Sequence, residues 1–486
     1  MNKLTPDARQ EEAIELMLAE AKSFGGSGGV LNGSEMGVGK TLLAVETMLR
    51  MWARRALVIA PLSTFDGWSA TLDAQSDGQT ELRPCANKAL GNYTAKECKE
   101  NLRALLAGER GYFFLGREHA VTLDWGMVET AATDDDGNAK KRAKQKGIFK
   151  NLEFDYCVVD ESHRWSNRKS RGFKTFMTIN ADLKCASSGT FFSNKIENAW
   201  SATRPIFPNH VSLSFYAWKD EFCKTEYAQF EWDKKAIVGE KIPGAFVNSL
   251  PCYIHLKRSD VNHKPTPDIR HVDLSPEQRK AYDDIESTMV TFVENDPIIT
   301  ELPITMRIRL RQLSLGMFHV NEDDEIDFRD DAKSTKFDEL KNIMADIPDE
   351  KILIFTDSAK FARVVTNKLN ARKTVAGLWS GQVSQKDREA VKASFLAEDG
   401  IQYIVAVIAA AGTGVDQLQT VCSTVVFLSE SESGIDNEQA IARIDRKGQQ
   451  NPVKVYKILA RNTYDEGVMD SLLNQALQNN ASRTKI

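Results

Sequence analysis

The chain has 486 residues, of which 42% are hydrophobic and 27% are charged, and its formal net charge at pH 7 is −5. A chain of this length is too long to fold around one ordinary hydrophobic core, so we expect two or three domains. The apolar runs are shorter than the ~20 residues of a membrane span, and the N-terminus has no signal-peptide core. Seven scattered cysteines without a CxxC pair argue against a disulfide framework or a zinc cluster. We therefore expect a protein of a reducing interior, without a membrane, cytoplasmic in a bacterium or a virus-infected host and nuclear in a eukaryote.

Short β-branched or aromatic runs alternate with helical patterns, which indicates parallel sheets covered by helices on both faces. The predicted strands are 56–61, 111–116, 154–161, 351–356, 402–408, 424–429 and 453–459. They fall into two groups, which predicts an α/β protein with lobes over 1–204 and 336–486. Between them, 205–335 is rich in aromatic and charged residues and then helical in pattern, which favours helical insertions and a linker. The charged segment 133–147 predicts a solvated loop, with a DNA contact by its lysines as the alternative.

The strongest chemical signal is GSEMGVGKT at 33–41, just before a helical stretch. The residues predicted to bind a nucleotide there are Gly37, Val38, Gly39, Lys40 and Thr41. The two glycines would let backbone N–H groups surround phosphate oxygens, the lysine would reach the β- and γ-phosphates, and the threonine would bind magnesium. Ser34 departs from the pattern, because glycine or alanine is usual at this position. The segment predicts a phosphate-binding loop.

The second signal is FDYCVVDESHRW at 154–165, an apolar strand that ends in two acids. A phosphate-loop ATPase needs such a pair, with Asp160 to hold magnesium and Glu161 to orient and deprotonate the attacking water. An Asp-Glu pair can also cap the next helix, but its place at a strand's carboxyl end favours the catalytic interpretation. His163 has no partner at zinc-ligand spacing, so we interpret it as a residue that forms hydrogen bonds within the site.

These motifs resemble those of superfamily-two helicase motors, and further motifs narrow the resemblance to the Swi/Snf-type ATPases, a family of DNA translocases. The counterparts are SEMGVGKT (34–41), APLSTFDGW (60–68), DESHRWSNRKS (160–170), SGTFFSNKIENAW (188–200), LKRSDV (256–261), LSPEQRKAYDDI (274–285), LRQLSLG (310–316), STK (334–336), SGQVSQKDREAVKASF (380–395), AAAGTGVDQLQ (409–419), QAIARIDRKGQ (439–449) and VKVYKILARNTYDE (453–466). Phe191 stands for the family's proline, and 409–419 lacks an arginine and a glycine. The resemblance covers nearly the whole chain and implies two RecA-like parallel-sheet lobes with helical insertions between and on them.

The resemblance also implies roles for residues that no local pattern identifies. The added ATP-binding residues are Gln10, Gly414, Asp416 and Gln439, and the residues that couple nucleotide state to DNA are His163, Ser188 and Thr190. Arg443 and Arg446 would face the γ-phosphate from the second lobe and act as catalytic residues. If 439–450 is helical, Gln439 and the two arginines share one face. A solvated charged helix is the alternative.

The function that the resemblance implies is ATP-dependent translocation on double-stranded DNA, with ATP and Mg²⁺ as cofactors. Such a motor remodels DNA structures or displaces bound proteins in replication, recombination or repair, and the sequence does not identify a recruiting protein. Duplex or branched DNA would be held by its phosphates without sequence specificity. The candidate DNA contacts are Thr64, Lys195, Arg311 and Thr413, with a structural arginine as the alternative for Arg311. A strand-separating helicase and a nucleotide-gated DNA-binding clamp without productive turnover are the alternative functions.

Overall fold

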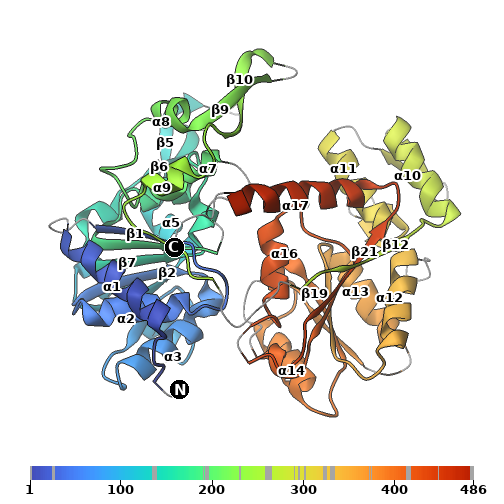
Figure 1. The fold of residues 1–486 in the computed structure, drawn as a ribbon, viewed down its shortest axis with the longest axis horizontal. Coiled ribbons are helices and arrows are strands. Elements are labelled where there is room, and N and C mark those ends of the chain that lie inside the picture. Colours follow the sequence, from blue (N-terminus) through green and yellow to red (C-terminus); the bar gives the residue numbers. More distant parts are fainter. Residues whose placement is uncertain are drawn as a thin grey trace. The chain divides into compact units, whose positions relative to one another are not determined.

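Two separate parallel sheets organise the chain, and each belongs to its own compact unit (Figure 1). The first unit comprises Met1–Arg258 and Gln478–Ile486, and the second comprises Ser259–Leu477. The computed structural model describes residues 3–23, 28–133, 139–189, 191, 196–228, 231–257, 265–288, 290–293, 296–299, 303–320, 326–328, 334–371, 373, 375–411, 417–446 and 448–481.

The first unit is built on a seven-stranded sheet in which every paired strand is parallel. In spatial order its strands are β11 (Tyr253–Ile254), β1 (Gly28–Asn32), β8 (Asn180–Ser187), β7 (Glu153–Asp160), β2 (Arg55–Ala60), β4 (Gly111–Gly116) and β3 (Leu82–Cys85). Strands β1 and β2 and residues 156–159 of β7 are largely apolar and buried, as expected for strands with helices on both faces. The carboxyl ends of β1, β7 and β8 meet at one edge of this sheet, because all three run in the same direction.

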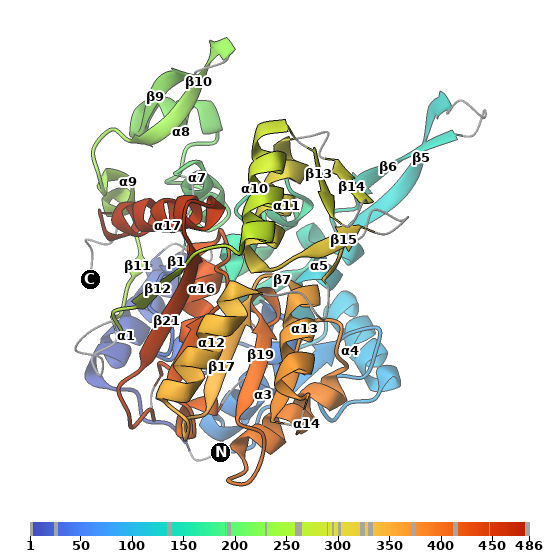
Figure 2. The ribbon, with the colours of Figure 1, turned by 90° about the vertical axis from the view of Figure 1, so that its right-hand side faces the viewer.

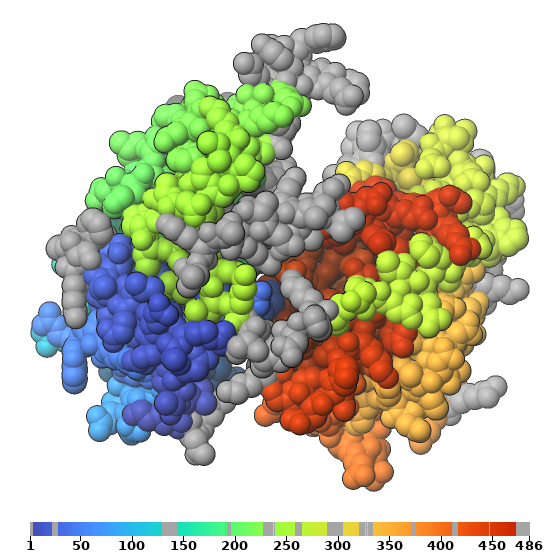
Figure 3. Space-filling view, viewed as in Figure 1, coloured from blue at the N-terminus to red at the C-terminus, as the bar shows by residue number. Residues whose placement is uncertain are grey.

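Helices and two hairpins complete the first unit. The helices are α1 (Ala8–Ser23), α2 (Lys40–Arg50), α3 (Phe65–Gln75), α4 (Ala95–Ala107), α5 (Arg117–Asp124), α6 (Arg171–Phe176), α7 (Glu197–Thr203), α8 (Phe215–Phe222) and α9 (Ala245–Ser249), with short 3₁₀ turns η1 (Leu62–Thr64), η2 (Ile148–Asn151) and η3 (Ser162–Trp165). The hairpins are β5 (Trp125–Thr133) with β6 (Ala139–Gln145), and β9 (Cys223–Ala228) with β10 (Glu231–Glu240). In the space-filling view, α1 in blue and α9 in yellow-green lie on the outer surface of this unit (Figure 3).

The second unit has a six-stranded parallel sheet with its own core. In spatial order its strands are β12 (Asp268–Val272), β21 (Lys454–Ala460), β20 (Thr424–Phe427), β17 (Ile352–Thr356), β19 (Tyr403–Val407) and β18 (Ala376–Trp379). Its other elements are α10 (Pro276–Thr288), α11 (Pro303–Leu315), α12 (Thr335–Asp346), α13 (Ala359–Leu369), α14 (Gln385–Leu396), α15 (Ile408–Ala411), η4 (Leu418–Thr420), α16 (Gly434–Ile441), α17 (Tyr464–Ala481) and the hairpins β13 (Val290–Val293) with β14 (Asp296–Ile299) and β15 (Phe318–Val320) with β16 (Ile326–Phe328).

The prediction of an α/β protein with two RecA-like parallel-sheet lobes is confirmed, and all seven predicted strands are present. The segment 205–335 contains helices but also gives β11 to the first sheet and β12 to the second. The prediction of a loop over 133–147 is wrong, because Ala139–Gln145 forms β6. All seven cysteines are buried and free. Among the described residues, no helix combines the length and the apolar character that a membrane crossing requires.

One buried ion pair lies in the core of the second unit. Lys336 on α12 is fully buried, and its Nζ lies 2.5 Å from Oδ2 of Asp465 and donates to the carbonyl of Leu428 at 2.8 Å. The Asp465 carboxylate also accepts from the hydroxyl of Ser314 at 3.2 Å and from the backbone N–H of Ala460 at 3.0 Å. The pair therefore joins the starts of α12 and α17 to the ends of β20, β21 and α11.

Candidate nucleotide-binding site

The predicted phosphate loop joins the end of β1 to the start of α2. Gly37 (φ 80°) and Gly39 (φ 86°) adopt the left-handed conformation that favours glycine. Space also restricts Gly39, because a Cβ there would lie 2.8 Å from Nε2 of Gln10. Lys40 and Thr41 are the first two residues of α2, so the backbone N–H groups at the helix start face the region that the loop encloses.

Gln10 is fixed against this loop by the way α1 begins. The backbone N–H of Gln10 donates to Oδ1 of Asp7 at 2.9 Å, and the N–H of Asp7 donates to Oε1 of Gln10 at 2.8 Å. These reciprocal bonds form a capping box. The box leaves the amide Nε2 of Gln10 to donate to the carbonyl of Val38 at 2.8 Å. The Asp-x-x-Gln spacing is a signal that sequence reasoning missed, and it explains why Gln10 lies at the loop.

Lys40 lies within the loop, close to the two acids at the end of β7. Its Nζ donates to the carbonyl of Ser34 at 2.9 Å and to that of Glu35 at 3.1 Å. Burial lowers the pKa of Lys40, and the negative charges of Glu161, Asp160 and Glu35 oppose this shift. The site thus brings one ammonium group close to the carboxylates at the end of β7.

Asp160 and Glu161 lie at the carboxyl end of β7 and at the turn that follows it. Burial, and then the charge of Glu161, raise the pKa of Asp160 to about 6, although Lys40 acts in the opposite direction. The backbone of Glu161 is left-handed (φ 50°, ψ 43°), which is uncommon for a residue with a side chain. Strained backbone of this kind often marks functional sites.

His163 connects the acids of β7 to the end of β8. Its Nδ1 lies 3.2 Å from Oε2 of Glu161 and 2.9 Å from Oγ of Ser188. The backbone N–H of Ser188 donates to the carbonyl of Asn32, the last residue of β1. The predicted site residues Lys40, Asp160, Glu161, His163 and Ser188 therefore lie together at one edge of the first sheet. The interpretation of His163 as a residue that forms hydrogen bonds within the site agrees with these distances.

A segment from much later in the chain supports the phosphate loop. Residues 253–256, here called the strap, run parallel to β1 and continue along the loop, where Gly33 and Glu35 donate backbone N–H groups to Ile254 and Leu256. The buried hydroxyl of Ser34 accepts from the N–H of Leu256 at 3.0 Å, which accounts for a serine at this position. His255 lies 2.7 Å from the carbonyl of Gly33 through Nδ1. Sequence reasoning did not identify the strap.

Asp160→Asn should raise the free energy of unfolding of the nucleotide-free protein by about 1–3 kcal/mol at pH 7.5. The folded carboxylate has a pKa of about 6 against an ordinary 3.8, so the folded state holds its proton more tightly than the unfolded state. Ionisation of Asp160 therefore destabilises the folded state as pH rises from about 4 to 6. Asparagine does not ionise, so the variant lacks this loss of stability. Urea titrations of both proteins at pH 4 and 7.5 measure the difference, which should shrink at pH 4. The exposed Asp66→Asn is the control, and an unchanged or lower stability of Asp160→Asn at pH 7.5 would contradict the assignment.

In the second unit, Gln439 is buried on α16, but this helix ends at Ile441. The prediction that Gln439, Arg443 and Arg446 share one helical face is therefore wrong, because both arginines lie in the turns that follow. Gln449 stabilises these turns by donating Nε2 to the carbonyls of Cys422 at 2.8 Å and Ile444 at 3.1 Å. Arg443 and Arg446 are both half-buried.

The candidate DNA contacts have varied surroundings. Thr64 follows β2, and its hydroxyl donates to the carbonyl of Pro61 at 2.7 Å. The guanidinium of Arg311 pairs with Asp357 and with Glu432, and it donates to the carbonyl of Glu430. These contacts favour the structural interpretation of Arg311. The predicted residues that lie outside the described residues are Thr190, Lys195, Thr413, Gly414 and Asp416.

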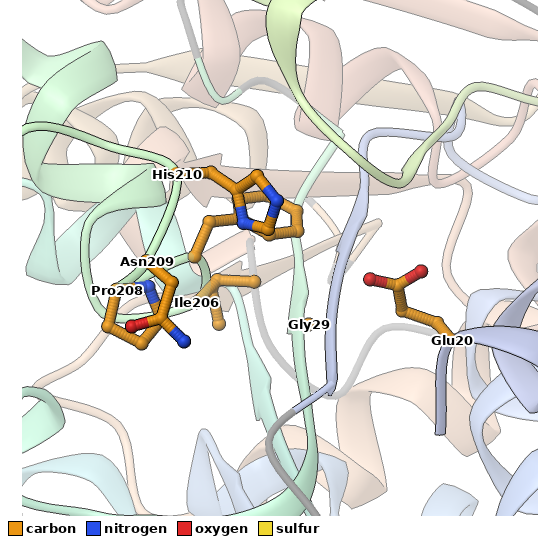
Figure 4. A pocket seen from close by; sticks show the side chains of 7 residues that line it. Glu20, Gly29, Ile206, Pro208, Asn209 and His210 are labelled. Carbon is orange, nitrogen blue, oxygen red and sulfur yellow. The ribbon is translucent and has the colours of Figure 1, made fainter. Parts of the chain in front are cut away.

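A small cavity in the first unit lies away from this edge of the sheet. Gly29, Ile206, Pro208 and His210 line it, with Glu20 of α1 on the opposite side (Figure 4). Its volume of about 10 Å³ is close to the minimum for one water molecule, so it is too small for a nucleotide.

Comparisons with known proteins agree with the motifs. Residues 9–315 match the family described as SNF2-related domain, and residues 335–448 match the helicase conserved C-terminal domain. The chain is 21% identical to ATP-dependent helicase fft3 of Schizosaccharomyces pombe, with 89% of this chain and 52% of that protein covered. It is 23% identical to an uncharacterized ATP-dependent helicase, MG018, of Mycoplasma genitalium, with 94% and 40% covered. The chain thus spans about half the length, or less, of these curated relatives.

A solved structure is also similar, the SWI2/SNF2 ATPase core of Sulfolobus solfataricus in complex with dsDNA. It shares 19% sequence identity with this chain, and the match covers 99% of this chain and 94% of that one with a TM-score of 0.41.

Proposed function

The chain belongs to the family of SNF2-related ATPases, and on this premise we propose that it is an ATP-driven translocase on double-stranded DNA. Its movement remodels DNA structures or displaces bound proteins in replication, recombination or repair. The observation that carries the proposal is the arrangement of Lys40, Asp160, Glu161, His163 and Ser188 at one edge of the first sheet. This arrangement provides the groups needed at a γ-phosphate, together with contacts that lead from Glu161 through His163 to Ser188.

Each of these side chains has a role in the proposal. Lys40 binds the β- and γ-phosphates, and Glu161 orients and deprotonates the attacking water. Thr41 and Asp160 would hold Mg²⁺, and their hard oxygen donors fit this ion, since a divalent cation favours the ionised form of a carboxyl whose pKa burial raises. When bound, the ion supplies charge compensation at the phosphates. His163 and Ser188, with Thr190, pass the nucleotide state toward the DNA.

The motifs that contain the remaining predicted residues assign each of them a role in the proposal. Gln10 reads the base beside the loop of Gly37, Val38 and Gly39, and the second unit contributes Gly414, Asp416 and Gln439 to nucleotide binding and Arg443 and Arg446 to hydrolysis. Thr64, Lys195 and Thr413 contact DNA phosphates, whereas Arg311 has the structural role that its ion pairs with Asp357 and Glu432 favour. The segment 205–335 supplies the helical insertions and the linker of the lobes 1–204 and 336–486, and it also adds β11 to the sheet of the first and β12 to the sheet of the second.

The test is the rate of ATP hydrolysis with duplex, single-stranded, forked and four-way DNA. Duplex-containing DNA should stimulate hydrolysis with little strand displacement on a tailed duplex. Stimulation by single strands alone would overturn the proposal, and efficient strand separation would favour a helicase instead.

Lys40→Ala should lower the DNA-stimulated hydrolysis rate by at least about 10³-fold, because it removes a cation whose charge acts on Asp160 and Glu161 at the phosphate site. Lys99→Ala on the surface of α4 is the matched control and should hydrolyse ATP at the normal rate. Phosphate release with saturating duplex DNA measures both. A Lys40→Ala protein that still displaces DNA-bound proteins would support the nucleotide-gated clamp instead.

A further inference from the structure

The first unit concentrates positive charge in two segments although the chain as a whole is acidic. Neither 139–152 nor 162–181 contains aspartate or glutamate. Their cations are Lys140, Lys141, Arg142, Lys144, Lys146, Lys150, Arg164, Arg168, Lys169, Arg171 and Lys174. Glu129 lies opposite Lys141 in the pairing of β5 with β6, and three further acids at 134–136 precede these cations in the sequence. A local excess of this size creates a positive field that the net charge of −5 does not reveal.

The two segments meet at the root of the β5–β6 hairpin. Trp125, at the start of β5, donates Nε1 to the hydroxyl of Thr175 at 3.1 Å. Arg171 and Lys174 of α6 lie 5.6 Å and 5.7 Å from the centroid of the Trp125 ring. Gln145, at the end of β6, donates Nε2 to the carbonyl of Lys174 at 3.0 Å. Lys144 and Lys146 at the end of β6 and Arg171 and Lys174 of α6 therefore lie on one surface, here called the basic surface.

A buried carboxylate makes this root rigid. Asp124 is fully buried, and its carboxylate accepts from the N–H of Ile148 at 3.0 Å, from Nε2 of Gln145 at 2.7 Å and from the hydroxyl of Thr175 at 3.0 Å. The hairpin and α6 are thus fixed to each other by one side chain. Figure 2 shows β5 and β6 extending from the body of the first unit. The basic surface is therefore presented on a fixed support.

Charge and exposure indicate what this surface binds. Lys144, Lys146, Arg171 and Lys174 are exposed, and within the described residues no carboxylate pairs with their side chains. A group of exposed cations favours a polyanion with closely spaced charges, and duplex DNA carries one charge per about 1.7 Å of its axis. We propose that the basic surface is a second, sequence-independent DNA contact of the first unit, which holds the duplex by its phosphates. This inference rests on the proposed function, in which duplex DNA is the track.

The surface is also connected in the chain to the hydrolysis site. The segment 162–181 begins one residue after Glu161, and His163, which contacts both Glu161 and Ser188, lies within it. DNA bound to the basic surface restrains the segment that carries His163, so the contact contributes to the stimulation of hydrolysis. The same contact increases the affinity for DNA, so its effect is largest at low DNA concentration.

The test replaces Lys144, Lys146, Arg171 and Lys174 together by Gln. Fluorescence anisotropy with a 30-base-pair duplex, over a range of NaCl concentrations, gives the slope of log Kd against log salt. We expect this slope to decrease by about 3.6, since each of the four lost phosphate contacts removes about 0.9. The duplex concentration for half-maximal ATP hydrolysis should rise at least about tenfold at low salt. The rate without DNA should not change.

A matched control replaces Lys88, Lys96, Lys99 and Arg103 of the same unit by Gln, which lowers the charge equally on another surface. Its slope should match that of the unmodified protein.

If the variant of the basic surface shows the normal slope and half-maximal concentration while duplex still stimulates the unmodified protein, this inference is overturned and the proposed function stands. If duplex fails to stimulate the unmodified protein but the slope still decreases in the variant, the proposed function fails and the contact stands. Loss of binding only to phosphatidylserine vesicles would assign the surface to a membrane and overturn the inference.

Discussion

Arg446→Ala should bind ATP normally and hydrolyse it about 10³-fold more slowly, or worse, in the presence of duplex DNA. The first unit places one ammonium group, that of Lys40, near Asp160 and Glu161, whereas phosphoryl transfer needs further positive charge on the transferring group. The motif that contains Arg446 implies that the second unit supplies this charge. The same result is expected for Arg443→Ala.

The expected separation of binding from hydrolysis makes this prediction specific. Binding of a fluorescent ATP analogue should be unchanged, while phosphate release with saturating duplex falls. Arg446→Lys should recover little activity, because an ammonium group cannot reproduce the fork of guanidinium donors. Arg461→Ala is the control, since Arg461 is 52% exposed and pairs with Asp273 on the surface of the same unit. Full DNA-stimulated hydrolysis in either alanine variant would return that arginine to the solvated-surface interpretation.

Lys336→Ala should lower the free energy of unfolding of the second unit by about 3–5 kcal/mol. Lys336 is fully buried, and its removal leaves the carboxylate of Asp465 in the core without its cation. The bonds from Ser314 and Ala460 hold the carboxylate in place, so it cannot turn toward water without breaking them. A urea titration followed by circular dichroism measures the change.

Two comparisons make the cause of this loss identifiable. Lys341→Ala, on the same helix, removes an exposed ion pair with Asp338 at 2.7 Å and should change stability by less than about 1 kcal/mol. Lys336→Met combined with Asp465→Asn should lose less stability than Lys336→Ala alone, because it leaves no unpaired charge. A loss of similar size in all three proteins would show that the buried charge is not the cause.

The sequence predicted those parts of the fold and site whose signal is local. Apolar strands such as β2 and β17 and the glycines of 33–41 are recognisable because burial on both faces and left-handed backbone each select a residue type. Strand β8 carried no such signal, since Asn180, Asp182 and Lys184 interrupt its apolar residues. Strand β11 has only two residues and exists through its pairing with β1.

The end of α16 shows why the remaining details could not be predicted. The spacing of Gln439, Arg443 and Arg446 is compatible with a helix, yet the helix stops at Ile441. The amide of Gln449 donates to the carbonyl of Ile444 and to that of Cys422, which lies on a distant segment. Gly448 turns the chain with φ 97°. A bond to a distant segment is a tertiary contact, and no local periodicity encodes it.

The strap has a consequence for the order in which the protein is made. Gly33 and His255 are separated by 222 residues, so the phosphate loop leaves the ribosome long before the segment that supports it. At about 5–20 residues per second, the strap follows the loop by roughly 10–40 s. During that interval the nascent chain contains the complete nucleotide-binding motif but not the partners of Gly33, Ser34 and Glu35. We expect the growing chain to acquire ATP affinity only after Leu256 has emerged, well after its P-loop sequence is complete.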